Sequence, residues 1–392
     1  MARDTCPVCG GTGIADFLQR DQVPVHQNLV MAGQVQARAA PRGSLTMAVC
    51  DGCGFVFNRA FDPDKLAYGQ DYDNTQSHSV MFDGYLDQLV DQLVNRHGVR
   101  GARVVEVGCG KGHFLRKLVL FPGADNRGFG FDPSYVGPQA DLAGRLLFRR
   151  CFYDASCSDV VADFVVCRHV IEHVPDPLLL LRAVRAALGH CPDARVFFET
   201  PCVEWILRHQ VLWDFFYEHC SLFSQASLRL AFERCGFVVE QVQHVFGGQY
   251  LWLEARLSNE SVARPTAVAG ATPQLAHAYG AGEQLLRRTW LSRLGALKAG
   301  GKLALWGAGA KGVTFANLVD PDCSSLDCVV DINPNKQGCF IPGTGHAIVA
   351  PGALVQRDVR NIILMNPNYA HENRALLAAA GCDANLIDWS EK

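Results

Sequence analysis

Residues 103–112 read Arg103-Val-Val-Glu106-Val-Gly108-Cys-Gly110-Lys-Gly112, a short apolar run that passes directly into three glycines at alternate positions. The apolar run predicts a buried strand, and the residues from Gly112 to Leu120 have the pattern of a helix. Glycine has no Cβ, so the backbone can turn tightly between strand and helix and can approach a ligand closely. The stretch therefore predicts an α/β fold with a cofactor held at the end of this strand.

Acidic residues after the predicted strands indicate which cofactor this glycine loop serves. Glu106 closes the first strand, where it can interact with the positively charged methionine end of S-adenosylmethionine (SAM). Asp132 follows the second strand and is placed to accept hydrogen bonds from ribose hydroxyls. Asp154, after the next strand, can meet the adenine amino group, and Arg168 follows the fourth strand into the same crevice. The spacing is not Gly-x-Gly-x-x-Gly, so SAM is the expected cofactor; a dinucleotide or a simple tight turn is the alternative.

Strands and helices alternate after the glycine loop, which predicts a doubly wound parallel sheet. Two further strands, at 237–245 and 250–256, are separated by a pair of glycines and predict a closing antiparallel pair. The sheet of SAM-dependent methyltransferases ends in this way. The other expected elements are strands at 128–131, 163–167 and 195–199 and helices at 177–188 and 224–235.

Two Cys-x-x-Cys-Gly sequences lie ahead of the glycine loop, at Cys6/Cys9 and Cys50/Cys53. Each pair can occupy two corners of a tetrahedron, and the following glycine lets the backbone turn beneath the sulfur atoms. Four thiolates match Zn²⁺ and leave no open coordination position, so the sequence predicts a structural zinc site rather than a catalytic one. A pair of free or redox-active dithiols is the alternative.

The chain divides into three expected domains. Residues 1–75 hold the cysteine pairs and can build little core alone, so we expect a zinc-binding domain there. Residues 76–260 form the expected methyltransferase domain. After a linker rich in Ser, Ala, Pro and Gly, residues 274–392 hold a second strand–glycine–helix unit at 303–312, which predicts a C-terminal Rossmann-like α/β domain.

The composition narrows the partners and the location. A length of 392 residues suggests two or three domains. A net charge of −3 gives no overall positive potential that would attract nucleic acid or an anionic membrane. No apolar run reaches the length of a membrane span, and the chain begins in a cysteine pair, so we expect neither an anchor nor a signal peptide. Most of the 16 cysteines stand singly in apolar stretches, which predicts reduced thiols and a cytoplasmic location. The expected partner is a small-molecule substrate.

The triplet Tyr217-Glu218-His219 follows the fifth predicted strand and is expected over the cofactor crevice. Methylation of a carbon needs a proton removed first, and the imidazole of His219 titrates in the right range. Glu218 can orient that ring, and a phenol, Tyr217 or Tyr72, can donate to a developing enolate. His173 follows the fourth strand toward the same crevice, where a structural role and a site role are both open. An aromatic lid without chemistry is the alternative for the triplet.

Together these motifs resemble the SAM-dependent C-methyltransferases that act on TDP-4-keto-deoxysugars in antibiotic pathways. The resemblance covers essentially the whole chain and is carried by the paired cysteines, the glycine loop, Glu218-His219 and the run from Asp331 to Gly338. It implies a four-cysteine zinc domain, a class I SAM-methyltransferase Rossmann-like domain and a C-terminal Rossmann-like domain. It also implies that His219 is the base, supported by Glu218, and that His173 lies near the substrate.

The resemblance further implies a nucleotide-sugar substrate, held with help from the C-terminal domain, which binds no nicotinamide in that family. Lys311 and Lys336 are then candidate contacts for the diphosphate. Three positions depart from the family: Phe216 replaces a tyrosine, and His169 and Val313 replace asparagines. An O- or N-methyltransferase, a non-catalytic protein with the SAM fold, and a dehydrogenase that uses the C-terminal glycine loop are the alternatives.

Overall fold

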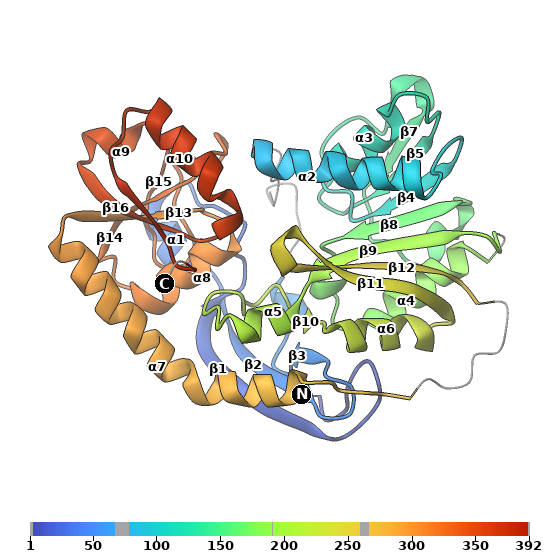
Figure 1. Cartoon of the computed structure of the whole chain (residues 1–392), viewed down its shortest axis with the longest axis horizontal. Helices are drawn as coiled ribbons and strands as arrows, with labels where there is room; N and C mark the ends of the chain where they lie inside the picture. The colour runs from blue at the N-terminus through green and yellow to red at the C-terminus, as the bar shows by residue number, and fades with distance from the viewer. Residues whose placement is uncertain (1–2, 67–77, 190, 259–265, 391–392) are drawn as a thin grey trace.

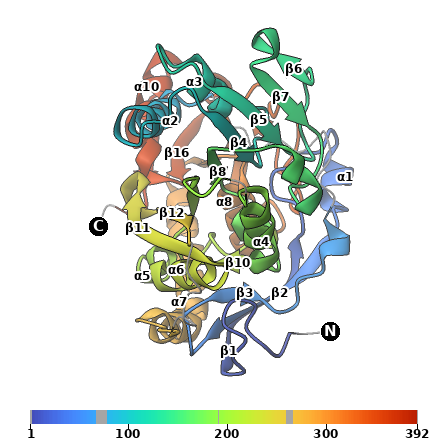
Figure 2. The same cartoon turned by 90° about the vertical axis from the view of Figure 1, so that its right-hand side faces the viewer.

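The computed structural model describes residues 3–66, 78–189, 191–258 and 266–390, and within them the chain forms three sheets (Figures 1 and 2). The largest has the order β11-β12-β9-β8-β4-β5-β7-β6, with five parallel strands in the middle. The strand order reverses at β4, because β5 and β7 lie on one side of it and β8 and β9 on the other. The strands are β4 (Arg103–Val107), β5 (Arg127–Phe131), β6 (Ala140–Asp141), β7 (Leu146–Arg149), β8 (Phe164–Arg168), β9 (Arg195–Pro201), β11 (Phe237–Val245) and β12 (Tyr250–Leu257).

Both faces of this central sheet are covered by helices, because alternate strand residues point to opposite sides. Val104 and Val166 lie in one core with α2 and α3, whereas Val105 and Val165 lie in another with α4 and α6. The observed layers are those of the α/β, doubly wound fold that the sequence predicted. The helices are α2 (Val80–Asp91), α3 (His113–Leu120), α4 (Pro177–Ala187), α5 (Val203–Arg208) and α6 (Gln225–Arg234).

The N-terminal sheet takes its last strand from the middle of the chain. Its order is β1-β2-β3-β10, where β1 is Ile14–Pro24, β2 Arg42–Cys50, β3 Val56–Asn58 and β10 Ser221–Leu222. The segment that carries the Tyr217–His219 triplet therefore runs straight into this sheet. The short helix α1 (Gln34–Arg38) follows a bridge between Met31 and Phe340, so the N-terminal residues also contact the C-terminal part of the chain.

The C-terminal sheet is entirely parallel, in the order β15-β14-β13-β16-β17, and its order reverses between β13 and β16. The long helix α7 (Thr272–Ala299) runs from the N-terminal sheet to this domain (Figure 1). A Cβ at Gly280 would come within 2.0 Å of the Phe17 carbonyl oxygen, so α7 packs on β1 at a distance that only glycine allows. The other elements are β13 (Lys302–Trp306), α8 (Ala310–Val319), β14 (Leu326–Val330), β15 (Ile348–Val349), α9 (Ala353–Gln356), β16 (Val359–Leu364), α10 (Ala370–Ala379) and β17 (Asn385–Asp388).

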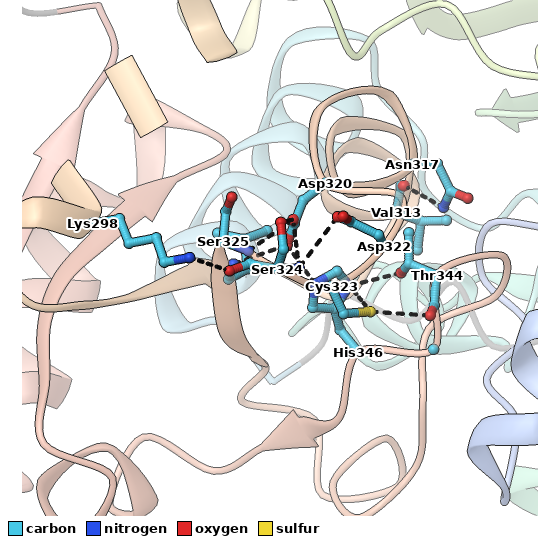
Figure 3. Close-up of polar contacts among 12 residues, drawn as sticks. Lys298, Val313, Asn317, Asp320, Asp322, Cys323, Ser324, Ser325, Thr344 and His346 are labelled. Carbon is cyan, nitrogen blue, oxygen red and sulfur yellow. Dashed lines mark hydrogen bonds and ion pairs between the residues drawn. The ribbon is translucent and has the colours of Figure 1, made fainter. Parts of the chain in front are cut away.

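A buried carboxylate fixes the loop from α8 to β14 at the amino end of the C-terminal sheet (Figure 3). Asp320 accepts hydrogen bonds from the backbone N–H groups of Ser324, Ser325 and Leu326. The imidazole of His346 lies 2.9 Å from the same carboxylate. These contacts set where β14 begins.

The carboxyl edges of the central and C-terminal sheets face each other, and polar contacts connect them. Gln249 and Asn366 exchange two hydrogen bonds, at 2.8 and 3.2 Å. Glu372 of α10 accepts hydrogen bonds from the Ser79 hydroxyl and the Val80 backbone N–H at the start of α2. Among the described helices, none has the length and apolar character needed to cross a membrane.

Candidate active site

One cavity, here called the cofactor cavity, has a volume of about 630 Å³ and lies at the carboxyl ends of β4, β5 and β8. The glycine loop forms one wall: Gly108, Gly110 and Gly112 have φ angles of 71°, 53° and 76°, which favour glycine. A Cβ at Gly108 would come within 2.0 Å of Val170, whereas nothing lies within 4 Å of that position at Gly110. The loop therefore leaves space above Gly110 where a ligand can approach the backbone.

The three predicted acidic residues line this cavity in different surroundings. Glu106 accepts a hydrogen bond from a backbone N–H of α3, and burial raises its pKa to about 8 against the opposing charge of Arg168. Asp132 accepts a hydrogen bond from the Gly110 N–H at 2.8 Å and so ties the loop to the end of β5. Asp154 is exposed and caps a short 3₁₀ turn. A bound cation would favour the ionised form of Glu106.

Arg168 lines the cofactor cavity with its side chain only 8% exposed. Its guanidinium donates to Glu199 at 2.9 Å and lies 4.8 Å from the centre of the Phe114 ring. Its Nε has no hydrogen-bond partner among the described residues. A buried donor of this kind fits a ligand carboxylate, such as that of the methionine end of SAM. With the open space above Gly110 and the ionisable Glu106, the residues present fit this cofactor.

The second cavity, here called the acceptor cavity, has a volume of about 260 Å³ and lies between the central and C-terminal domains. Pro201 and Tyr250 line it from the central sheet. Trp306, Gly307 and Met365 line it from the point where the C-terminal strand order reverses. Ligands of open α/β sheets bind at such reversal points, so the acceptor cavity lies at the reversal point of the C-terminal sheet.

The C-terminal domain contributes two lysines and a buried amide to the lining of the acceptor cavity. Lys311 donates to Asp214 at 2.7 Å, and Lys336 donates to the Ala308 carbonyl at 3.3 Å. The buried Nδ2 of Asn373 also lines the cavity and has no partner among the described residues. A ligand with acceptor oxygens would satisfy that donor.

Two imidazoles occupy the wall between the cavities. His173 lines the cofactor cavity and His219 the acceptor cavity, and their ring centres are 4.8 Å apart with the planes at 88°. Burial, together with the charges of His173, His169 and Lys311, holds the pKa of His219 well below its usual range. His219 is therefore neutral at physiological pH and can accept a proton.

The carboxylate beside this imidazole pair is Glu172, which the sequence analysis missed. Its side-chain oxygens and the ring nitrogens of His173 and His219 include atoms that all lie within 4.8 Å of one another. Such a group has the chemistry of metal ligands, but Glu172 is already engaged by the Thr200 hydroxyl and the His169 ring. We interpret it as an acid–base group. Its signal in the sequence was a second Glu-His dipeptide, directly after β8.

The prediction that the Tyr217 hydroxyl faces the crevice is wrong. That hydroxyl accepts a hydrogen bond from the Asp62 backbone N–H, and Tyr217 lines neither cavity. Its ring packs on Gly43, where a Cβ would come within 2.4 Å of it. Phe216 lines the acceptor cavity instead, with its ring centre 4.1 Å from that of His219. The other candidate phenol, Tyr72, lies outside the described residues.

Glu218 is buried and joins its segment to the N-terminal residues. It accepts a hydrogen bond from the Gln27 backbone N–H at 2.7 Å, and its carboxylate lies 3.7 Å from His26. These contacts fix the backbone that carries His219. Its predicted role of orienting the His219 ring stays a prediction.

The four cysteines of the two predicted pairs come together at one end of the N-terminal sheet. Their sulfur atoms all lie within 4.8 Å of one another, with Cys6–Cys53 at 3.6 Å and Cys9–Cys50 at 3.4 Å. Zinc–sulfur bonds of about 2.3 Å in a tetrahedron require sulfur–sulfur separations only slightly longer than these. The geometry fits a metal ion bound by all four residues.

Two protein-family models match the chain. "Methyltransferase domain" matches residues 81–242, and "C-methyltransferase C-terminal domain" matches residues 265–381. The chain therefore carries a methyltransferase domain followed by a C-methyltransferase C-terminal domain, as the resemblance implied.

Curated relatives match only part of the chain. The ubiquinone biosynthesis O-methyltransferases of Actinobacillus pleuropneumoniae serotype 7 (strain AP76) and Vibrio campbellii (strain ATCC BAA-1116) are 30% and 34% identical over 114 and 117 residues. These matches cover 26% and 28% of this chain and 47% of each relative, so the chain spans about half the length of the curated relatives it matches.

Among solved structures, two methyltransferases each share 18% identity with the chain at a TM-score of 0.36. One is the Burkholderia thailandensis 1,6-didemethyltoxoflavin-N1-methyltransferase, matched over 47% of this chain and 83% of that one. The other is the magnesium protoporphyrin IX methyltransferase of Synechocystis PCC 6803, matched over 47% and 88%.

Proposed function

We propose that the chain, which carries a methyltransferase domain and a C-methyltransferase C-terminal domain, is a SAM-dependent enzyme that methylates a carbon atom of a nucleotide-activated keto-deoxysugar. The observation that carries the proposal is the pair His173–His219 on the wall between the cofactor and acceptor cavities. Methylation of carbon requires a base where donor and acceptor meet, and this pair occupies that place.

In the proposed reaction, His219 removes the proton from the carbon next to the ketone. The electrons of that C–H bond move toward the carbonyl oxygen and give an enolate, for which Tyr72 is a candidate hydrogen-bond donor. SAM, when bound, supplies an electrophilic methyl group. The enolate carbon forms the new C–C bond as the C–S bond breaks, and the proton leaves His219 for solvent. Holding the methyl donor and the acceptor carbon close together, where the two cavities meet, would supply much of the rate.

The acceptor cavity supports an anionic nucleotide-sugar. Lys311 and Lys336 are proposed to contact the diphosphate, since ammonium groups bind phosphate oxygens strongly. Asp331, at the end of β14, already accepts hydrogen bonds from the Ala308 and Asn333 backbone N–H groups. This engagement favours a nucleotide-sugar over a nicotinamide cofactor, whose ribose such an acid would bind.

We also propose that Cys6, Cys9, Cys50 and Cys53 hold a structural Zn²⁺. The ion would stabilise the N-terminal sheet, and β10 of that sheet follows His219 by one residue. The 16 cysteines form no disulfide bond, and we propose a cytoplasmic location, where thiols stay reduced. Residues 1–75, 76–260 and 274–392 are our proposed domain boundaries, with β10 completing the first domain.

The proposal is tested by incubating the protein with SAM and a TDP-4-keto-deoxysugar and locating any new methyl group by NMR. We expect a methyl group on the carbon next to the ketone. A methyl group on oxygen or nitrogen would replace the proposal with an O- or N-methyltransferase. Binding of both ligands without product would favour a non-catalytic role.

A further inference from the structure

His169 occupies a strained position where the two cavities meet. It directly follows β8 and lines both the cofactor cavity and the acceptor cavity. Its φ angle is 54°, in the left-handed region that residues other than glycine seldom adopt. Strain of this kind persists only where surrounding contacts hold the residue firmly.

Each ring nitrogen of His169 faces a buried carboxylate. Nε2 lies 2.6 Å from Glu199 Oε1, and Nδ1 lies 3.3 Å from Glu172 Oε1. Only the Nδ1–Glu172 contact has hydrogen-bond geometry, whereas the Nε2–Glu199 contact is a close ion pair without hydrogen-bond alignment. Arg168 and the Tyr85 hydroxyl donate to Glu199. The ring of His169 therefore lies between two buried carboxylates, which favour its positively charged form.

The charges of these groups agree with that geometry. Burial opposes the charge on His169, but Glu199 and Glu172 outweigh it and raise its pKa to about 9. Burial likewise opposes ionisation of Glu199, but Arg168 and His169 lower its pKa to about 2. The Tyr250 ring lies edge-on to His169, with ring centres 4.5 Å apart, and burial raises the pKa of its phenol. At neutral pH the ring of His169 is the cation and that phenol is neutral.

We propose that His169 is a positioning residue whose fixed positive charge keeps the neighbouring His219 free of a proton, and so ready to act as the base. The inference deepens the proposed function and rests on it for the role of His219. The charge of His169 adds to that of Lys311, which lies on α8 and is paired with Asp214. Near His219 lie His173 and Glu172 from the turn after β8, together with His169 and Lys311. Other charged groups that line the same cavity include Asp214, Asp331, Lys336 and Glu372.

The test removes the charge and follows the titration of His219 directly. His169→Asn is the first variant, because asparagine tolerates the left-handed backbone. His169→Gln removes the same charge and serves if the first variant does not fold. His97→Asn is the matched control, since His97 is also buried, lies 3.2 Å from Glu254, and lines neither cavity.

In NMR of protein labelled with ¹⁵N-histidine, we expect the His219 titration to move about one to two pH units higher in both His169 variants. The signal is assigned with His219→Gln, and the control variant should leave it in place. The acidic limb of the pH profile of kcat should move by the same amount. An unchanged titration in either folded His169 variant would overturn the inference. A shifted titration with an unmoved acidic limb would uphold the charge effect and overturn instead the proposed role of His219 as the base.

Discussion

Two histidine–carboxylate pairs, each with a buried carboxylate, lie at opposite ends of their sheets. His169 and Glu199 lie at the carboxyl ends of β8 and β9, where His169 lines both cavities. His346 and Asp320 lie at the amino end of β14, where backbone N–H groups use the remaining capacity of the carboxylate (Figure 3). Both carboxylates are fully buried, so a buried charged group alone does not mark a functional site. The two pairs differ in the edge of the sheet on which they lie, because only the carboxyl edge borders the two cavities.

The pair His346–Asp320 shows that residues arranged like a catalytic triad can serve only to stabilise the fold. Cys323 Sγ lies 3.6 Å from the His346 ring, which gives the Cys-His-Asp order of a nucleophilic triad. The same sulfur lies 3.1 Å from the Thr344 carbonyl oxygen, and burial raises the pKa of its thiol. A reactive cysteine needs a lowered pKa, so these contacts fix a loop and provide no nucleophile.

The largest expected effect is on kcat, which should depend on a histidine at the carboxyl ends of the sheets and not on His346 at the amino end. Replacing His219 with alanine should lower kcat at least about 100-fold, the usual contribution of a general base. His346→Gln should leave kcat per folded molecule within about twofold, because its ring lies in neither cavity. Steady-state kinetics with folded fractions measured by circular dichroism compares them. Equal losses of kcat in the two variants would contradict the different roles assigned to the two histidines.

Stability should show the opposite order. His346→Asn leaves the buried Asp320 carboxylate without its imidazole partner and should lower the free energy of unfolding by about 2 kcal/mol. His219→Ala should cost less, since its ring faces a cavity and solvent can enter the space. Urea unfolding of both variants measures the difference. A larger loss for His219→Ala would contradict the structural role assigned to the Asp320 group.

The two Glu-His dipeptides offer a finer comparison. Glu172→Gln should lower kcat about tenfold, because it removes the carboxylate that lies within 4.8 Å of the ring nitrogens of His173 and His219. Glu218→Gln should chiefly lower stability, since its carboxylate holds the Gln27 backbone. Kinetics and thermal melting of the two glutamine variants distinguish the roles. If Glu218→Gln instead gives the greater loss of kcat, the sequence prediction that it orients His219 is the better one.

The smallest expected effect concerns Glu106, a buried carboxylate with no imidazole beside it. Its pKa of about 8 means that it is largely protonated at pH 7, and a bound sulfonium would favour ionisation. SAM binding should therefore release a proton, and the affinity should strengthen as pH rises toward 8, by at most about tenfold per unit. Calorimetry in two buffers with different ionisation heats measures the released proton. Glu106→Gln should abolish that part of the release; equal release from both proteins would refute the assignment.

The sequence predicted the features that depend on local signals. Neighbouring residues are enough to predict the alternating strands and helices, the glycine loop and the paired cysteines. The structure contains each of these features. The meeting of Glu172 with His219, the pairing of β10 with β3, and the φ angle of His169 depend on packing between distant segments. The prediction for Tyr217 was wrong for a local reason. Adjacent side chains in an irregular segment point in different directions, and Phe216 rather than Tyr217 lines the acceptor cavity.

Proton exchange tests the central claim, that His219 is the base at the wall between the two cavities, most directly. The protein is mixed in deuterated water with S-adenosylhomocysteine and a TDP-4-keto-deoxysugar, so that no methyl transfer can follow. We predict that the wild-type protein exchanges the proton next to the ketone for deuterium and that His219→Ala does not. Exchange at the same rate in both proteins would contradict the account.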